Sequence, residues 1–116
     1  MKERYMDDCI FCKIVDKQIS SNIVFENAKV LGFLDIEPSH EMHVLFVPKK
    51  HVSSLHELDP NDIGLISDLY AAALEFSKKE GLSHHRTLIN TGEPFQEVFH
   101  VHLHLLSGNR LKSRHN

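Results

Sequence analysis

Hydrophobic and polar residues follow two different periods along this chain, which together predict both strands and helices. Runs rich in β-branched and aromatic residues predict strands over residues 23–25, 30–34, 42–48, 86–90 and 99–106. Asn27-Ala28 separates the first two runs and indicates a hairpin, while Pro48 closes the third run. Apolar residues at helical spacing predict a short helix over residues 10–15.

Residues 59–81 predict a second, longer helix. Asp59 suits the N-cap, Pro60 suits the first helical position, and Gly81 suits the position after the C-cap. The predicted apolar stripe consists of Ile63, Ile66, Leu69, Tyr70, Ala73, Leu74 and Phe76. The element order indicates an α+β fold with a mostly antiparallel sheet of about five strands, one short helix and one long helix. We expect a single domain over residues 1–116.

Composition narrows the functional class. The chain has 116 residues, and its 41% hydrophobic content supports one packed core. A net charge of -3 gives no basic surface for nucleic acid. The charged N-terminus lacks the apolar run of a signal peptide, and no segment reaches the ~18 apolar residues of a membrane span. We therefore expect a cytoplasmic protein that has neither a membrane nor a nucleic-acid partner.

The stretch HVHLHLL, residues 100–106, carries the clearest chemical signal. Because strand side chains alternate, His100, His102 and His104 are expected on one face, about 7 Å apart. Val101, Leu103 and Leu105 face the other way and are expected to pack under the long helix. Strict alternation beside an apolar face argues against a polar sheet face that happens to use histidine. Imidazole serves as a nucleophile, a proton carrier, a hydrogen-bond donor to phosphate or a metal ligand.

Several segments together resemble the histidine triad family. HVHLHLL matches its His-φ-His-φ-His-φ-φ motif. CIFCKI resembles the family's N-terminal helix, FLDIEPSHEMHVLFVPKKH its ribose-binding and central-strand segment, and NTGEPFQEVFH its phosphate loop. The resemblance covers roughly residues 9–110 and implies the histidine triad fold. The tail LLSGNRLKSRHN is most similar to the nucleoside phosphoramidate hydrolase branch.

This resemblance implies an enzyme that cleaves purine nucleoside 5′-phosphoramidates and releases AMP or GMP. His102 would be the nucleophile and form a covalent nucleotidyl-histidine intermediate. His104 would donate a hydrogen bond to a phosphate oxygen. His43 would orient the site or relay protons, or serve a structural role, and Gln96 would contact the scissile linkage.

The resemblance also implies a nucleotide site. Asp35 would accept hydrogen bonds from the ribose hydroxyls, or else serve as a turn residue, and Phe11 and Ile36 would line the base pocket. The phosphate would meet Asn90 and the backbone amides around three successive residues, Gln96, Glu97 and Val98. Glu97 stands where some relatives have serine, and either acts as an acid or points to solvent. Phe95 replaces a usual glycine in a loop one residue shorter than in many relatives.

A structural zinc ion is the one cofactor implied, with no organic cofactor. The C-x-x-C pair alone is a weak signal. By resemblance, the zinc ligands would be Cys9, Cys12, His51 and His100. Two buried free thiols are the alternative. A redox pair is disfavoured because no thioredoxin-like βαβ pattern surrounds it.

Two alternative functions and a homodimer also have to be considered. A dinucleoside polyphosphate hydrolase and a purine-nucleotide-binding regulatory module with little turnover are the alternatives. A site with all three triad imidazoles on one metal conflicts with the ~7 Å strand spacing. The resemblance implies a homodimer, in which the long helix and the strand before the phosphate loop pair with a second copy. This pairing would also cover an exposed sheet edge.

Overall fold

Five strands form one antiparallel sheet in the order β1-β2-β3-β5-β4. The computed structural model describes residues 8–112. Its elements are α1 (Ile10–Val15), β1 (Ile23–Glu26), β2 (Val30–Leu34), β3 (His40–Pro48), α2 (Gly64–Lys79), β4 (Arg86–Ile89) and β5 (Leu103–Arg110), with 3-10 turns at Leu55–Glu57 and Pro60–Asp62. The predicted α+β fold, with one short and one long helix on an antiparallel sheet, is confirmed. None of the helices in this part of the chain is long and apolar enough to cross a membrane.

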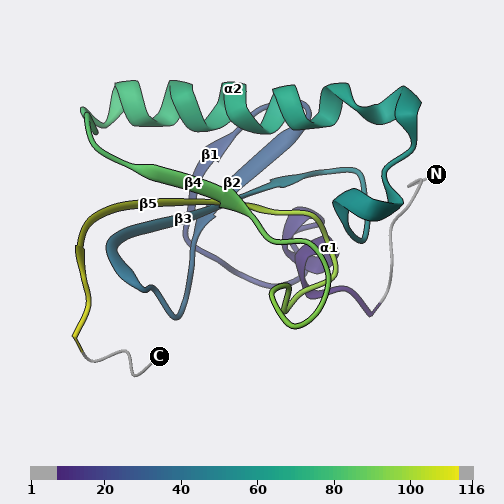
Figure 1. Ribbon diagram of the computed structural model, residues 1–116, viewed down its shortest axis with the longest axis horizontal. Coiled ribbons are helices and arrows are strands. Elements are labelled where there is room, and N and C mark those ends of the chain that lie inside the picture. Colours follow the sequence, from purple (N-terminus) through teal and green to yellow (C-terminus); the bar gives the residue numbers. More distant parts are fainter. Residues whose placement is uncertain (1–7, 113–116) are drawn as a thin grey trace.

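The two helices cover opposite faces of the sheet (Figure 1). Strand β3 divides its side chains between them by alternation. Val44 and Phe46 pack in the cluster that contains the buried residues of α2. Leu45 and Val47 pack in the cluster on the α1 face. The apolar residues of HVHLHLL, Val101, Leu103 and Leu105, all join the α2 cluster, as the alternation predicted. The imidazoles are thereby directed toward the α1 face.

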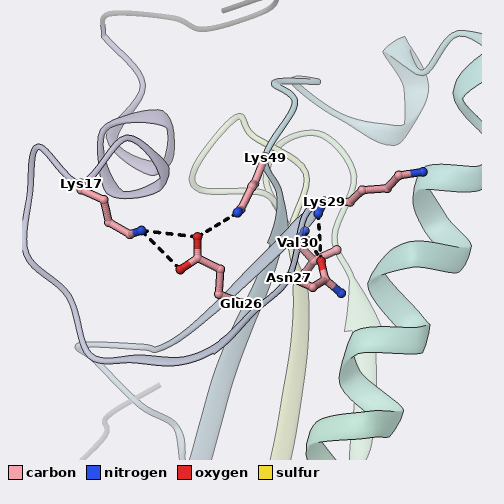
Figure 2. A network of polar contacts seen from close by, with 6 residues as sticks. All are labelled: Lys17, Glu26, Asn27, Lys29, Val30 and Lys49. Atoms are coloured by element: carbon pink, nitrogen blue, oxygen red, sulfur yellow. Dashed lines mark hydrogen bonds and ion pairs between the residues drawn. The ribbon is translucent and has the colours of Figure 1, made fainter.

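The β1–β2 turn and the end of α1 are fixed by polar contacts (Figure 2). The Asn27 side-chain oxygen accepts hydrogen bonds from the backbone amides of Lys29 and Val30, which closes the predicted hairpin. The Glu26 carboxylate accepts from Lys49 at 2.8 Å and from Lys17 at 3.3 Å. The hydrogen bond from Lys49 is the main cause that lowers the pKa of Glu26. Glu26 therefore connects the end of α1 to strands β1 and β3.

The predicted long helix starts later, and its buried stripe is shifted. The Asp59 side chain accepts from the Asn61 amide and caps a 3-10 turn, so that α2 begins only at Gly64. The residues of α2 that face the core are Leu65, Leu69, Ala72, Ala73, Phe76 and Ser77. Ile63, Tyr70 and Leu74, which belonged to the predicted stripe, are 60%, 36% and 48% exposed. The predicted stripe was too wide for the one face that meets the sheet.

The helix ends as predicted. Gly81 adopts a φ of 71°, a conformation that glycine tolerates best. The Gly81 amide donates to the Lys78 carbonyl and the Leu82 amide to the Ser77 carbonyl. This pair of hydrogen bonds is the Schellman motif that satisfies the last carbonyls of a helix.

The predicted histidine strand was too long at its start. Strand β5 begins at Leu103, which pairs with Phe46 of β3. His100 lies in a bend before the strand. The intervening Val101 amide donates to the Val52 carbonyl, so this segment is held by the loop after β3 and not by a sheet neighbour. The alternation of faces nevertheless continues through it, because Val101 joins the same core as Leu103.

Candidate functional site

Two groups of metal-ligating or titratable side chains lie on the α1 face of the sheet. The first contains Cys9, Cys12, His51 and His100, and the second contains Asp35, His43 and His104. In each group the ligand atoms lie within 4.8 Å of one another. His102 lies between the groups, with ring contacts to Phe11 on one side and to His104 on the other. The fold thus brings together residues from α1 and its N-cap, the end of β2, β3 and the loop after it, and β5 with the segment before it.

The first group, called here the Cys/His cluster, has the spacing of a tetrahedral metal site. Cys9 Sγ and Cys12 Sγ lie 3.4 and 3.6 Å from His100 Nδ1. His51 Nδ1 lies 3.3 Å from Cys12 Sγ and 3.2 Å from His100 Nδ1. Tetrahedral zinc, with bonds of about 2.3 Å to sulfur and about 2.0 Å to nitrogen, places its ligand atoms roughly 3.3–3.8 Å apart. The four residues therefore fit a zinc ion that would sit among them.

The hydrogen bonds of the Cys/His cluster also suit a metal. His100 Nε2 donates to the Pro48 carbonyl at 2.8 Å, which leaves Nδ1 as an unprotonated ligand atom. Burial lowers the pKa of His100 to about 4, so the neutral ligand form prevails at pH 7. Cys9 Sγ caps α1 by accepting from the Cys12 amide. Both cysteines are buried and are not joined in a disulfide.

His102 has one ring nitrogen engaged and one available. Its Nδ1 lies 2.8 Å from the His100 carbonyl oxygen. A carbonyl only accepts, so Nδ1 carries the proton and Nε2 keeps its lone pair. Burial is the largest cause that lowers the pKa of His102, and the hydrogen bond to His100 and the charges of Asp35 and Glu97 oppose it. The geometry therefore presents a neutral imidazole with a free basic nitrogen.

A chain of hydrogen bonds fixes the tautomers of His43 and His104. The Ser39 amide donates to His43 Nδ1 at 3.0 Å, so the His43 proton resides on Nε2. His43 Nε2 lies 3.0 Å from His104 Nδ1 and donates to it. The His104 proton therefore resides on Nε2, which is buried and has no hydrogen-bond partner within residues 8–112. A buried, unpaired N–H group is well suited to donate to a ligand oxygen.

The same tautomers make the second group a poor metal site. A metal needs a nitrogen with a free lone pair. His43 Nε2 carries a proton, and the lone pair of His104 Nδ1 is occupied because it accepts the hydrogen bond from His43. Asp35 Oδ2 lies 3.4 Å from His43 Nε2 and stabilises that protonated position. Burial, followed by the neighbouring His102 and His43, lowers the pKa of His104 to about 3. This group is arranged for hydrogen bonding.

The predicted ribose and base residues occupy contrasting positions. Asp35 follows β2, and its Oδ1 accepts from the Glu37 amide at 2.8 Å. Phe11 is buried, with ring edges against His102 at 5.1 Å and Phe33 at 5.4 Å. Ile36 is 90% exposed. The two residues predicted to line the base pocket therefore differ in depth, with Phe11 in the core and Ile36 at the surface.

The loop after β4 is organised around Gln96. Gln96 Nε2 donates to the carbonyls of Ser53 and Val98, and its Oε1 accepts from the Gly92 amide. The Gln96 side chain is 3% exposed, so it holds the loop together from inside. Its own amide donates to the Gly92 carbonyl. Gln96 is thus placed to position the predicted phosphate loop.

The remaining predicted loop residues lie around this centre. Among the described residues, the amides of Glu97 and Val98 donate to no protein acceptor. Asn90 is half-buried and directly follows β4. The Glu97 side chain is exposed, and Phe95 is 70% exposed. Two backbone amides, and not the three expected, are therefore available to an anion here.

Sequence reasoning missed the backbone groups that set the tautomers. The Pro48 and His100 carbonyls and the Ser39 amide decide which nitrogen of each imidazole carries its proton. No residue type signals such a role, because almost every residue offers the same backbone groups. The chain fold alone places them.

A family model described as "Scavenger mRNA decapping enzyme C-term binding" matches residues 8–115. Protein HitA of Neisseria gonorrhoeae is 41% identical over 103 residues, which cover 87% of this chain and 96% of the relative. The chain belongs to the histidine triad family. Another relative, the 14 kDa zinc-binding protein of Brassica juncea, is 37% identical over 108 residues, with 90% and 96% coverage.

Solved structures of histidine triad proteins share the fold. A HIT family hydrolase from Legionella pneumophila superposes with a TM-score of 0.84 at 37% identity, covering 89% of this chain and 95% of that one. A histidine triad nucleotide-binding protein from Candida albicans superposes with a TM-score of 0.78 at 37% identity, with 88% and 76% coverage. The histidine triad assignment therefore rests on sequence and on fold.

Proposed function

We propose that this histidine triad protein is a hydrolase that cleaves purine nucleoside 5′-phosphoramidates through a covalent intermediate on His102. The observation that carries the proposal is the free Nε2 of His102, whose other nitrogen donates to the His100 carbonyl at 2.8 Å. A neutral imidazole with a free lone pair is the form that attacks phosphorus. The unpaired Nε2–H group of His104 adds a donor for the phosphate oxygen that gains charge.

The reaction has two steps. First, His102 Nε2 attacks the α-phosphorus, the bond between phosphorus and the amine nitrogen breaks, and the amine departs with that electron pair and a proton from water. Second, water attacks the phosphorus and the bond to Nε2 breaks. Its electrons return to the imidazole, and a proton passes to solvent. The products are the amine and a nucleoside monophosphate.

Remaining residues position the substrate in this scheme. Asp35 accepts from the ribose hydroxyls, and Phe11 and Ile36 border the base. Asn90 and the free amides of Glu97 and Val98 bind phosphate oxygens, with Gln96 holding their loop. The His43 side chain orients His104.

The choice of phosphoramidates rests on the resemblance of the tail LLSGNRLKSRHN, of which residues 113–116 lie outside the described residues. The solved relatives titled as a hydrolase and as a nucleotide-binding protein support the broader activity.

A direct assay compares the wild type with His102→Ala on a fluorogenic adenosine phosphoramidate and on diadenosine tetraphosphate. We expect amine release from the first substrate, and loss of at least about 10³-fold in the variant, because the covalent route is removed. Faster cleavage of diadenosine tetraphosphate would favour a polyphosphate hydrolase. Equal, very slow release by both proteins, together with tight AMP binding, would favour a regulatory module.

We also propose that the Cys/His cluster binds one zinc ion. The separations of its ligand atoms and the protonated Nε2 of His100 support this, and one relative is named a zinc-binding protein. Metal analysis of protein purified without added metal tests it. About one equivalent of zinc is expected for a closed four-ligand site. Reduced thiols with less than about a tenth of an equivalent would refute it.

We further propose a homodimer built on β4 and α2. Within residues 8–112, strand β4 ends the sheet, and its outer backbone groups lack a strand neighbour. Thr87 Oγ1 of β4 lies 3.4 Å from the hydroxyl of Tyr70, which places the exposed apolar residues Tyr70 and Leu74 of α2 beside this edge. A second copy would cover both the edge and the apolar residues. Sedimentation at micromolar concentration is expected to give a dimer, and a monomer there would refute the proposal.

A further inference from the structure

We propose that the Cys/His cluster does more than brace the fold: its metal positions the His102 nucleophile. This inference rests on the proposed hydrolase function. Two separate contacts lead from the cluster to the His102 ring, one through the backbone of His100 and one through the ring of Phe11. His51 and the two cysteines are then positioning residues that act through these contacts.

The first contact passes through a single residue. His100 is fully buried, and its ring is fixed at both nitrogens, by the Pro48 carbonyl on Nε2 and by the cluster on Nδ1. The carbonyl of this same residue accepts the Nδ1 proton of His102. That hydrogen bond decides which nitrogen of His102 is free to attack. Movement of the His100 ring therefore moves the carbonyl that sets the nucleophile's tautomer and orientation.

The second contact passes through α1. This helix has only six residues, with Cys9 as its N-cap and Cys12 in its first turn. A helix of this length does not hold its own shape in water, so it depends on its attachments. Phe11 lies between the two cysteines and packs its ring against His102 at 5.1 Å and His100 at 6.0 Å. Metal binding by the cysteines therefore fixes the ring that supports the nucleophile.

In this proposal a shared cation would hold the cluster closed. The Nδ1 atoms of His51 and His100 lie 3.2 Å apart, and the lone pair of His100 Nδ1 points toward its neighbour. A metal bound by two imidazole nitrogens and two thiolate sulfurs would hold them at such separations. Loss of the metal releases His51 and the cysteines, and both contacts to His102 loosen together.

The test compares His51→Ala with His51→Cys. His51 contacts His100 and Cys12 within the cluster, so its replacement acts on the cluster while Phe11 and His104, which contact the His102 ring, stay unsubstituted. His51→Ala removes a ligand, whereas His51→Cys keeps four ligands in a Cys₃His set. His56→Ala is the matched control, because His56 is exposed on the 3-10 turn Leu55–Glu57 and its side chain makes no hydrogen bond or ion pair within residues 8–112.

Three readouts are measured on each protein: zinc content, kcat and KM for the phosphoramidate, and the ¹⁵N signals of the His102 ring. A misplacement of about 1 Å costs up to about 10²-fold in rate, so His51→Ala should lose zinc and at least about tenfold in kcat, with KM changed less. Its His102 signals should shift away from a single tautomer protonated at Nδ1. His51→Cys and His56→Ala should keep the zinc, the rate and the signals of the wild type.

The outcomes separate this inference from the proposed function. Zinc loss with unchanged kcat and unchanged His102 signals would overturn the positioning role while leaving the hydrolase intact. A zinc-loaded wild type without turnover would overturn the proposed hydrolase function. The positioning role would then be tested only by comparing the His102 signals of His51→Ala with those of the wild type. Should His51→Ala fail to fold, chelation of the wild type followed by zinc addition gives the same comparison. Restored His102 signals support positioning, and signals indifferent to zinc refute it.

Discussion

His43 Nε2 lies 3.0 Å from His104 Nδ1, and this hydrogen bond determines which nitrogen of His104 faces the active site. The Ser39 amide donates to His43 Nδ1, so His43 donates through Nε2 to His104 Nδ1. The proton of His104 is thereby left on Nε2, which has no partner within residues 8–112. His43 thus fixes the proton of His104, which is the donor proposed to meet the phosphate.

Replacing His43 tests this chain of hydrogen bonds. His43→Leu removes the donor to His104 Nδ1, so that His104 is free to place its proton on the wrong nitrogen. Loss of one such charge-stabilising contact corresponds to about 1.4–3 kcal/mol, or roughly 10- to 100-fold in kcat. His40→Gln is the matched control, because the His40 ring contacts only the Ser39 side chain among the contacts described. Steady-state kinetics giving equal rates for His43→Leu and the control would contradict the chain.

Gln96 provides a test of loop positioning. Gln96→Ala leaves the Gly92 amide and two carbonyls without their partner, and the free energy of unfolding should fall by about 1–3 kcal/mol. AMP binding should weaken as well, because the amides of the following residues lose their support. Gln18→Ala removes an exposed hydrogen bond to Asp16 and should change neither property. Urea unfolding and calorimetric titration with AMP measure both, and unchanged values for Gln96→Ala would refute the positioning role.

The lowered pKa of His104 predicts how stability depends on pH. Burial is the main cause that brings this pKa from 6.5 to about 3. Below about pH 6.5 the unfolded chain accepts a proton at this residue that the folded chain does not. The free energy of unfolding should therefore fall as pH drops from 6.5 toward 3, by up to about 1.4 kcal/mol per unit from this group. Urea unfolding between pH 7 and 4.5 should give a shallower slope for His104→Gln, and equal slopes would contradict the prediction.

Asp35 is expected to recognise ribose. Asp35→Asn keeps the oxygen that accepts from the Glu37 amide, but replaces one ribose acceptor with a donor. The affinity for AMP should fall about tenfold, equivalent to about 1.4 kcal/mol. The affinity for 2′,3′-dideoxy-AMP should change little, because that ligand lacks both hydroxyls. Equal losses for the two ligands in calorimetric titrations would show that Asp35 serves the turn alone.

Residue patterns predicted the sheet and the face on which the histidines lie, because both follow from the alternation of side chains along a strand. Val101 and Leu103 pack on the α2 side, and His102 and His104 face α1, although β5 begins only at Leu103. The pattern did not reveal the 3-10 turn that delays α2 to Gly64, because that turn depends on how the chain meets the sheet. The expected dimer, zinc ion and cytoplasmic location stay predictions.

The sequence predicted which residues form the candidate site, but it could not predict which nitrogen of each imidazole carries the proton. Histidine spacing indicated which imidazoles share a face. The tautomer of His100 depends on the carbonyl of Pro48, which is distant in sequence, and that of His102 depends on the backbone conformation that points the His100 carbonyl at its ring. Gln96 illustrates the same limit, because its side chain bonds the carbonyl of Ser53, a partner distant in sequence.

The most direct test of the central claim is to trap the intermediate. Wild-type protein is mixed with excess adenosine phosphoramidate, quenched in base within one turnover, digested and analysed by mass spectrometry. The account predicts an adenylyl group on the peptide that contains His102, located on that residue by fragmentation and absent from His102→Ala. Turnover without this adduct, or with the adduct on another residue, would contradict nucleophilic attack by His102.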